Sequence, residues 1–325
     1  MNVRVFRKAL SGWYGRSRRD LPWRASNDFY RVWISEIMLQ QTRVEAVVGY
    51  YRRFLARFPS VEHLAAAEEA EVLAAWSGLG YYSRARNLQR AARQIAASRV
   101  PATYEEVLAL PGAGPYTAAA IASIALGLPH AAVDGNVMRV VSRLANDAAE
   151  ISHPATKRRF TAFAQELLDP RRPGDFNQAM MELGATVCRP VNPDCAACPV
   201  AAFCAARAAG TAHTLPVKLK KQAARDVPLD LALVRRDGRV LLVERGASEK
   251  RLAGFWELPE KKTMVRFRGR KVFEFRHRIV NDRFRVTVWA AASGERAGGR
   301  WFEPPELHGV PLTTVTKKAL AATSL

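Results

Sequence analysis

The hydrophobic pattern of this chain changes from a helical to a strand-like period near residue 210, and this change constrains the fold more than any other feature. Before it, Ala-rich runs such as EHLAAAEEAEVLAAW place apolar residues three and four positions apart, which is typical of helices. After it, residues 229–234 and 239–244 are rich in apolar and β-branched side chains and flank Asp237-Gly238, which predicts a β-hairpin. Residues 271–275 and 284–290 alternate apolar and polar side chains, as half-buried strands do.

The domain organisation is predicted from the same change. We expect a mainly α-helical domain over residues 1–210 and a small β-rich (α+β) domain over residues 229–325. Between them, residues 211–228 are polar and basic without sustained periodicity, which indicates a linker.

The charge of the chain favours a polyanionic partner, with nucleic acid first. It carries 50 Lys and Arg against 30 Asp and Glu, a net charge of +20. An Arg-rich proteome would explain much of this excess equally well, whereas 49% hydrophobic residues exclude a disordered basic tail. The sequence has neither a bilayer-spanning apolar stretch nor the apolar core of a signal peptide, so we expect a cytoplasmic protein without a membrane partner.

The four cysteines lie within seventeen residues with the spacing C-x6-C-x2-C-x5-C, which indicates a metal site rather than disulfides. Four thiolates satisfy either a zinc ion or an iron–sulfur cluster, so their chemistry leaves both open. The cysteines are Cys188, Cys195, Cys198 and Cys204.

A glycine turn at residues 110–114 precedes a predicted helix. Gly112 and Gly114 belong to this Leu-Pro-Gly-Ala-Gly turn, and Pro115 follows at a favourable first helical position. The free N–H groups of such a helix start suit a phosphate, although the spacing alone favours an ordinary helical hairpin.

Two carboxylates stand out beside apolar segments. Glu36 lies in a mostly apolar helical stretch, where burial would raise the pKa of its carboxyl group and make it a proton donor near neutral pH. Asp134 follows an apolar run and precedes Gly135. Composition alone favours an exposed Glu36 and a turn or N-cap role for Asp134.

The order of the motifs resembles a known family. LPGAGPYTA followed by VDGNVMRV is similar to the helix-hairpin-helix and catalytic-aspartate signature of the DNA glycosylase superfamily that includes endonuclease III. WISEIMLQQT, with LPWR, GLGYY and FNQ, resembles the MutY-type adenine DNA glycosylases within it. The resemblance covers most of residues 10–210, in the order of the family.

This resemblance implies catalytic roles for several residues. Glu36 would be the acid that protonates N7 of adenine, and Asp134 the carboxylate that stabilises the cationic sugar, with Asn136 positioning Asp134 or water. Tyr116 stands where the endonuclease III branch has the lysine that forms a Schiff base. We therefore expect a monofunctional glycosylase with no or weak lyase activity.

The resemblance also implies a 4Fe-4S cluster on the four cysteines and a set of DNA-binding positions. The adenine would be flipped out of the duplex. Gln41 and Tyr81 match wedge residues, and Thr42 and Leu79 match residues near the opposite base. The expected adenine pocket is lined by Trp23, Arg24, Leu39, Gln178 and Glu182.

The C-terminal segment, with VLLV and GFWELP, resembles the reduced Nudix-like domain of MutY proteins, and the acidic metal-binding Nudix helix is not visible. The family commonly has Phe-Ser-His where this chain has Ile279-Val280-Asn281, so the hydroxyl expected to address 8-oxoguanine is replaced by Val280. Asn281 is the candidate substitute.

The sequence therefore predicts a monomeric adenine DNA glycosylase that acts on double-stranded DNA containing adenine opposite 8-oxoguanine or guanine. Two alternatives stay open at this point. One is a glycosylase for another mispaired base on the same scaffold, and the other is a non-catalytic iron–sulfur DNA-binding protein.

Overall fold

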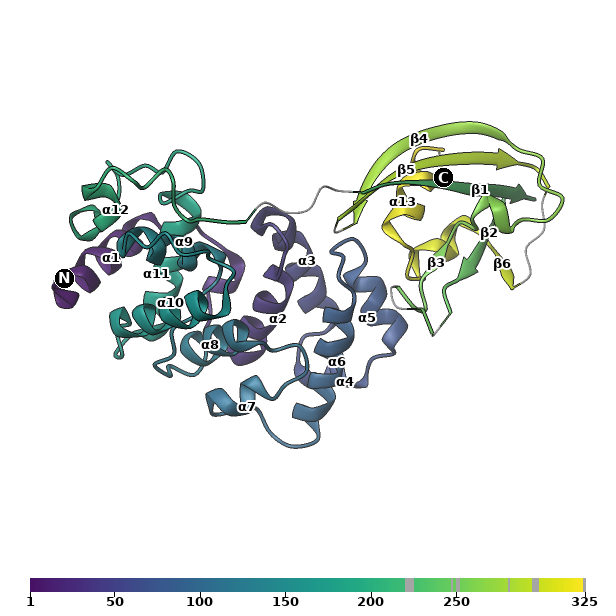
Figure 1. The fold of residues 1–325 in the computed structure, drawn as a ribbon. Coiled ribbons are helices and arrows are strands. Elements are labelled where there is room, and N and C mark those ends of the chain that lie inside the picture. Colours follow the sequence, from purple (N-terminus) through teal and green to yellow (C-terminus); the bar gives the residue numbers. More distant parts are fainter. Residues whose placement is uncertain (220–224, 247, 250–251, 280, 294–297, 324–325) are drawn as a thin grey trace. The chain divides into compact units, whose positions relative to one another are not determined.

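The chain forms two compact units in a computed structural model (Figure 1). The first unit comprises residues 1–65 and 90–220, and the second comprises residues 66–89 and 221–325. The residues described by the structure are 1–219, 225–246, 248–249, 252–279, 281–293 and 298–323.

The first unit is built from helices. Its helices are α1 (Val3–Ser17), α2 (Phe29–Leu39), α3 (Val44–Arg57), α7 (Tyr104–Leu108), α8 (Pro115–Ile124), α9 (Gly135–Leu144), α10 (Pro154–Leu167), α11 (Pro173–Thr186) and α12 (Ala205–Ala208), with 3-10 turns η1 (Pro22–Arg24) and η2 (Ala201–Phe203). Helices α4 (Val61–Ala66) and α6 (Ser83–Ala96) run across the boundary between the units, and α5 (Glu69–Trp76) belongs to the second unit.

Side-chain caps and prolines fix where the helices begin. The Asp28 carboxylate accepts a hydrogen bond from the Arg31 amide at 2.9 Å, which starts α2, and Thr103 accepts from the Glu106 amide at 3.2 Å, which starts α7. Pro115 occupies the first turn of α8, as the sequence predicted.

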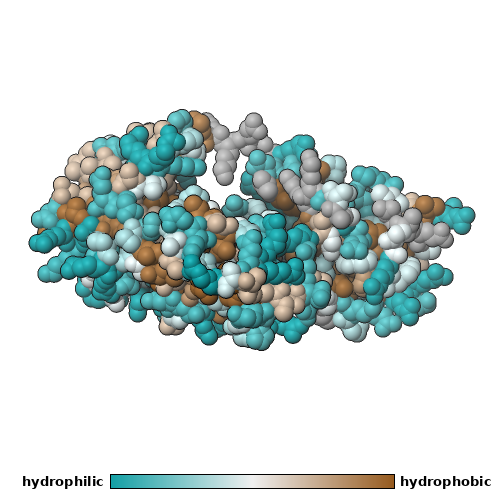
Figure 2. Space-filling model, turned by 90° about the horizontal axis from the view of Figure 1, so that it is seen from below, coloured by the Kyte–Doolittle hydropathy of each residue, from teal (hydrophilic) through white to brown (hydrophobic). Residues whose placement is uncertain are grey.

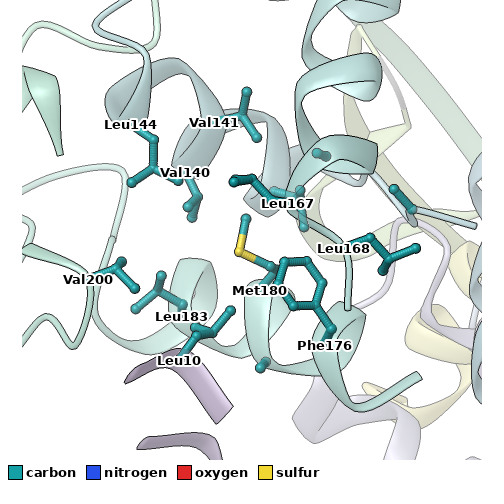
Figure 3. Packing of buried hydrophobic residues seen from close by; sticks show 14 of the residues in the cluster. Leu10, Val140, Val141, Leu144, Leu167, Leu168, Phe176, Met180, Leu183 and Val200 are labelled. Atoms are coloured by element: carbon teal, nitrogen blue, oxygen red, sulfur yellow. The ribbon is translucent and has the colours of Figure 1, made fainter. Parts of the chain in front are cut away.

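The main core of the first unit lies between α1, α9, α10 and α11. Its apolar side chains recur at helical spacing on each of these helices, so each helix turns one stripe toward the same interior (Figure 3). The labelled members in Figure 3 are Leu10, Val140, Val141, Leu144, Leu167, Leu168, Phe176, Met180, Leu183 and Val200. This packing holds α9 and α11, which carry candidate site residues, in a fixed relation.

The second unit contains a mixed sheet of order β3-β2-β1-β5-β4, with β6 also paired to β2. The strands are β1 (Arg225–Arg236), β2 (Arg239–Glu244), β3 (Trp256–Glu257), β4 (Arg270–Ile279), β5 (Asp282–Ala291) and β6 (Gly299–Phe302). The β1–β2 hairpin around Asp237-Gly238 is confirmed, and β1 pairs with β5 in parallel. Helix α13 (Thr314–Ala321) packs its apolar side on one face of the sheet, and short 3-10 turns η3 (Lys261–Thr263) and η4 (Pro304–His308) connect the strands.

The structure corrects the expected linker of residues 211–228. Ala212 and Leu215 are buried beside the cysteine loop, and the Val217 carbonyl accepts a hydrogen bond from the Ile151 amide at 3.0 Å. Strand β1 already begins at Arg225. The prediction of a linker was based on the polar composition of the segment and overlooked these two apolar side chains, which anchor it. The expected division at residue 210 also omits the helical residues 66–89, which cluster with the sheet.

The surface agrees with the basic, polar composition. Figure 2 shows hydrophilic side chains over most of the displayed face, with hydrophobic ones scattered between them. Among the residues that the structure describes, no helix combines the length and the apolar character needed to cross a bilayer.

Candidate active site

Glu36 is buried on α2, a helix with apolar side chains on nearly all of its faces. Only 5% of its surface is exposed. Burial raises the pKa of Glu36 to about 7, because a carboxylate loses its hydration there. Glu36 is therefore buried and not exposed as composition alone favoured, and the side chain can hold a proton near neutral pH.

Tyr116, on the first turn of α8, contacts Glu36 directly. Its hydroxyl donates to Glu36 Oε2 at 2.9 Å and lies 3.4 Å from Met181 Sδ. This hydrogen bond partly opposes the rise in the pKa of Glu36, whereas the negative charge of Asp134 adds to it. Burial and the neighbouring Glu36 hold the pKa of Tyr116 well above its usual value, so the phenol stays neutral.

Asp134 caps α9 and accepts three hydrogen bonds. Its Oδ1 accepts from the amides of Asn136 (2.9 Å) and Val137 (2.7 Å), and its Oδ2 accepts from Asn136 Nδ2 at 2.8 Å. Burial raises the pKa of Asp134, but these hydrogen bonds act against that rise and favour the ionised form at a helix N-terminus. Asp134 can therefore serve both as the N-cap of α9 and as an ionised carboxylate in the site.

Both carboxylates open into one cavity of about 1610 Å³ within the first unit. The lining includes many residues that the sequence singled out: Trp23, Arg24, Glu36, Leu39, Gln41, Thr42, Gly112, Gly114, Tyr116, Asp134, Asn136, Gln178 and Glu182. Gln40, at the end of α2, holds both the glycine turn and α8, because its Nε2 donates to the Gly112 carbonyl at 3.4 Å and to Thr117 Oγ1 at 3.0 Å. The fold thus brings segments from five parts of the sequence to one hollow.

Glu182 is a second buried carboxylate in the cavity wall, and its surroundings differ from those of Glu36. Arg19 donates to Glu182 through its amide, Nε and Nη2 at 2.8–3.1 Å, and Arg24 Nη2 donates at 2.8 Å. Burial alone would raise the pKa of Glu182, but these arginines lower it to about 2. Arg19 was not predicted from the sequence, because it lies 163 residues from its partner.

Two arginines on α9 join this site to the cysteine loop. Arg139 Nη2 donates to Asn136 Oδ1 at 2.8 Å and to the Gly184 carbonyl at 2.7 Å, and its Nε donates to the Cys188 carbonyl at 2.8 Å. Arg143 lies 3.2 Å from Cys188 Sγ. A side chain on Gly184 would come 2.6 Å from Asn136 Cβ, so the close approach of α11 requires glycine there.

The four cysteines line a second, small cavity between α9 and the loop after α11. None of the four cysteines forms a disulfide, and burial, with the other three thiols nearby, raises the pKa of the Cys198 thiol to about 11. In the described part of the chain, no three or more His, Cys, Asp or Glu side chains gather as ligands of a single metal ion. Four sulfurs around a common hollow fit the donor set of a polynuclear thiolate cluster.

The remaining predicted residues lie in the second unit. Leu79 is buried, and Tyr81 is exposed on the turn before α6. Asn281 is exposed between β4 and β5, and its carbonyl accepts a hydrogen bond from the Arg225 amide at 3.0 Å. Val280 lies outside the described residues.

Comparisons with known proteins agree with this arrangement. Residues 34–166 match the family described as "HhH-GPD superfamily base excision DNA repair protein". Over these residues, the chain is similar to that superfamily. The HhH-GPD segment contains Glu36, Tyr116 and Asp134, whereas Arg19, Glu182 and the cysteines flank it.

Among similar proteins is the human adenine DNA glycosylase, 48% identical over 217 residues, which cover 63% of this chain and 40% of the human protein. The Arabidopsis thaliana adenine DNA glycosylase is 38% identical over 295 residues, which cover 78% of this chain and 47% of that protein. The chain therefore spans less than half the length of these two relatives.

Solved structures share the helical HhH-GPD fold. A thermostable thymine-DNA glycosylase is 28% identical with a TM-score of 0.56 and covers 64% of this chain and 97% of its own. An endonuclease III–DNA complex, 20% identical with a TM-score of 0.53, covers 65% of this chain and 98% of its own and supports the fold alone.

Proposed function

We propose that this chain is a monofunctional adenine DNA glycosylase that removes adenine mispaired with 8-oxoguanine or guanine in double-stranded DNA. The observation that carries the proposal is the pairing of Glu36, with a pKa of about 7, and hydrogen-bonded Asp134 in one cavity. One carboxyl group that holds a proton and one that stays ionised are what cleavage of a glycosidic bond requires. The names of the relatives supply the choice of adenine.

Glu36 would act as the general acid. The flipped adenine enters the cavity, and Glu36 delivers its proton to N7 so that the base leaves as a neutral molecule. Because Tyr116 donates to Oε2 of Glu36, Oε1 is the oxygen left to carry the proton toward the base. The neutral phenol thereby orients the acid without removing its proton.

Asp134 would stabilise the positive charge that develops on the sugar as the bond breaks. Its three hydrogen bonds hold both oxygens in place, and Arg139 in turn holds the Asn136 amide that donates to Oδ2. Such preorganised charge is effective in a site that excludes water. Water then completes the hydrolysis and leaves an abasic sugar.

The strand would stay intact because Tyr116 occupies the position of the lyase lysine. A phenol cannot form an imine with the opened sugar, and the proposal is supported by the position of Tyr116, which lines the cavity and donates to Glu36. The lysines on the cavity lining, Lys157 and Lys218, belong to other segments.

Glu182 would hold the wall of the base pocket in place through its arginine partners and would not contact the base directly. Both of its oxygens are occupied by Arg19 and Arg24, so it fixes these two cations in the wall of the cavity. Gln178, one turn earlier on α11, accepts a hydrogen bond from the Tyr14 hydroxyl at 3.2 Å and can address the base with its amide group.

We also propose that the four cysteine thiolates hold a 4Fe-4S cluster. When bound, the cluster would cross-link the loop after α11 and keep it next to Arg139 and Arg143. The role of the cluster is then structural, and we expect the protein to act on DNA as a monomer.

Base release from a panel of mismatched duplexes tests the proposed function. The wild type should release adenine opposite 8-oxoguanine and guanine, and Glu36→Gln should bind these duplexes but release almost none. Glu166→Gln, at an exposed position on α10, is the matched control and should retain full activity. Release of thymine but not adenine would favour a glycosylase for another base, and binding without release by the wild type would favour a non-catalytic DNA-binding protein.

A further inference from the structure

Tyr81 sits on a turn whose backbone is held in an unusual shape. Gly78, Gly80 and Tyr81 have positive φ values of 111°, 72° and 49°, and the Tyr81 side chain is 48% exposed. Left-handed backbone is uncommon for a tyrosine, and such a conformation persists only where surrounding groups fix it. The turn therefore needs support, and the second unit supplies it from two sides.

Helices α5 and α6 support the carbonyl groups of the turn. Arg84 Nη2 donates to the carbonyls of Leu79 at 3.2 Å and Gly80 at 3.1 Å, and Trp76 Nε1 donates to the Gly80 carbonyl at 3.3 Å. Burial lowers the pKa of Arg84 to about 10, and its guanidinium lies over the rings of both Trp76 and Tyr81. These contacts connect the turn to its own helices.

The sheet part of the second unit supports the turn through Phe255. The Phe255 ring is fully buried and lies 4.1 Å from the Tyr82 ring, centroid to centroid. The Tyr82 hydroxyl in turn accepts a hydrogen bond from the Gly78 amide at 3.1 Å. A chain of contacts thus runs from Phe255 through Tyr82 to Gly78, across the turn that carries Tyr81.

Two further contacts join the same segments. Ser77 Oγ donates to the Leu312 carbonyl at 3.3 Å, and Arg86 donates to the Ala253 carbonyl. The Leu312 and Phe255 segments are themselves adjacent, because Trp256 forms a bridge with Leu312. The contacts with the turn therefore come from one continuous part of the sheet unit.

We propose that Phe255 and its neighbours position the turn of residues 77–82, so that the C-terminal part of the chain sets how Tyr81 is presented to DNA. The inference rests on the proposed function, because contact of Tyr81 with the base stack belongs to it. It gives the C-terminal segment a structural role that is independent of any contact with the base opposite adenine. Phe255 is a positioning residue and does not itself touch DNA.

Amide hydrogen exchange of the DNA-free, full-length protein tests the hold on the turn. Phe255→Leu keeps an apolar side chain but removes the ring that packs on Tyr82, and Phe302→Leu is the matched control, since Phe302 is equally buried in the sheet unit and packs on Trp256. Exchange at Gly78 through Tyr82 should become roughly tenfold faster in Phe255→Leu than in Phe302→Leu. Equal exchange in the two variants would overturn the inference.

A double-mutant cycle with Tyr81→Ala tests the consequence for DNA. Phe255→Leu should slow single-turnover base release roughly tenfold when Tyr81 is present and less than about twofold in the Tyr81→Ala background. The same loss in both backgrounds would show that Phe255 acts only on general stability, which overturns the inference.

The two measurements separate the inference from the proposed function. If the wild type releases no base, the proposed function fails, and the exchange experiment alone decides whether Phe255 holds the turn. If Tyr81→Ala releases adenine at the wild-type rate, the role of Tyr81 in DNA fails, and with it the claim that its presentation matters.

Discussion

The pH dependence of base release should report the protonation of Glu36. If the protonated acid is required, the single-turnover rate stays level at low pH and falls tenfold per pH unit above the pKa of Glu36. Burial raises that pKa to about 7 in the free protein. The phosphates of bound DNA disfavour a further negative charge, so the alkaline fall should begin at or above pH 7.

The expected effect is large compared with an unperturbed glutamic acid. At pH 7, a pKa of about 7 leaves about half of the Glu36 side chains protonated, whereas the ordinary value of 4.5 would leave roughly 0.3%. The hydrogen bond from Tyr116 stabilises the carboxylate and keeps the pKa from rising further. Such a bond to a charged group is worth about 1.5–3 kcal/mol, so its loss should raise the pKa by roughly one to two units.

The assay is single-turnover release of adenine between pH 5.5 and 9.5 with wild type, Tyr116→Phe and Tyr104→Phe. Tyr116→Phe should move the alkaline fall to higher pH. Tyr104→Phe is the control, because Tyr104 lines the same cavity but stacks on His130, and its profile should match the wild type. A wild-type fall centred below pH 5.5, or a shift to lower pH in Tyr116→Phe, would refute the argument.

Four further outcomes follow from the same structure. Because the pKa of Glu36 is about 7 in the folded protein and about 4.5 in the unfolded chain, the wild type loses stability as pH rises from about 4.5 to 7. Glu36→Gln should therefore be more stable than the wild type by up to about 3 kcal/mol at pH 8 but not at pH 4. Thermal unfolding of both proteins at the two pH values checks this. Iron and acid-labile sulfide analysis should find about four of each per chain, whereas stoichiometric zinc without sulfide would contradict the cluster. Borohydride should trap no covalent DNA complex, and efficient trapping lost on replacing a lysine would contradict the assignment of Tyr116. Arg285 lies on β5 and pairs with Arg276 of β4. Arg285→Gln should weaken binding to all duplexes alike and reduce the slope of log K against log salt concentration by about one. A loss of binding only for duplexes with 8-oxoguanine would contradict a phosphate contact.

Local sequence signals predicted much of the fold. The period change, the Asp237-Gly238 hairpin and Pro115 at a helix start all depend on residues close in sequence, and each is confirmed. The parallel pairing of β1 with β5 and the clustering of residues 66–89 with the sheet were not predicted. Both depend on partners far away in the chain, which no local period specifies.

In the candidate site too, contacts between residues far apart in the sequence were not predicted. Motifs located Glu36, Asp134 and Tyr116, and the structure brings them to one cavity. The arginines that surround the site were not predicted, because Arg19 and Arg139 are ordinary arginines in an Arg-rich chain. Their significance comes from the carboxylate and the amide that folding places beside them.

Glu36 and Glu182 show that the surroundings, and not the residue type, decide what a buried carboxyl group can do. Both line the same cavity, yet the pKa of Glu36 is raised to about 7 and that of Glu182 is lowered to about 2. Glu182 faces two guanidinium groups, whereas Glu36 has a neutral phenol as its direct partner. An arginine at position 116 would hold Glu36 ionised and abolish its use as an acid, and a lysine would add an amine as well as a charge. Tyrosine at this position is therefore compatible with both features of the proposed reaction, since it brings no positive charge that would hold Glu36 ionised and supplies no amine for strand cleavage.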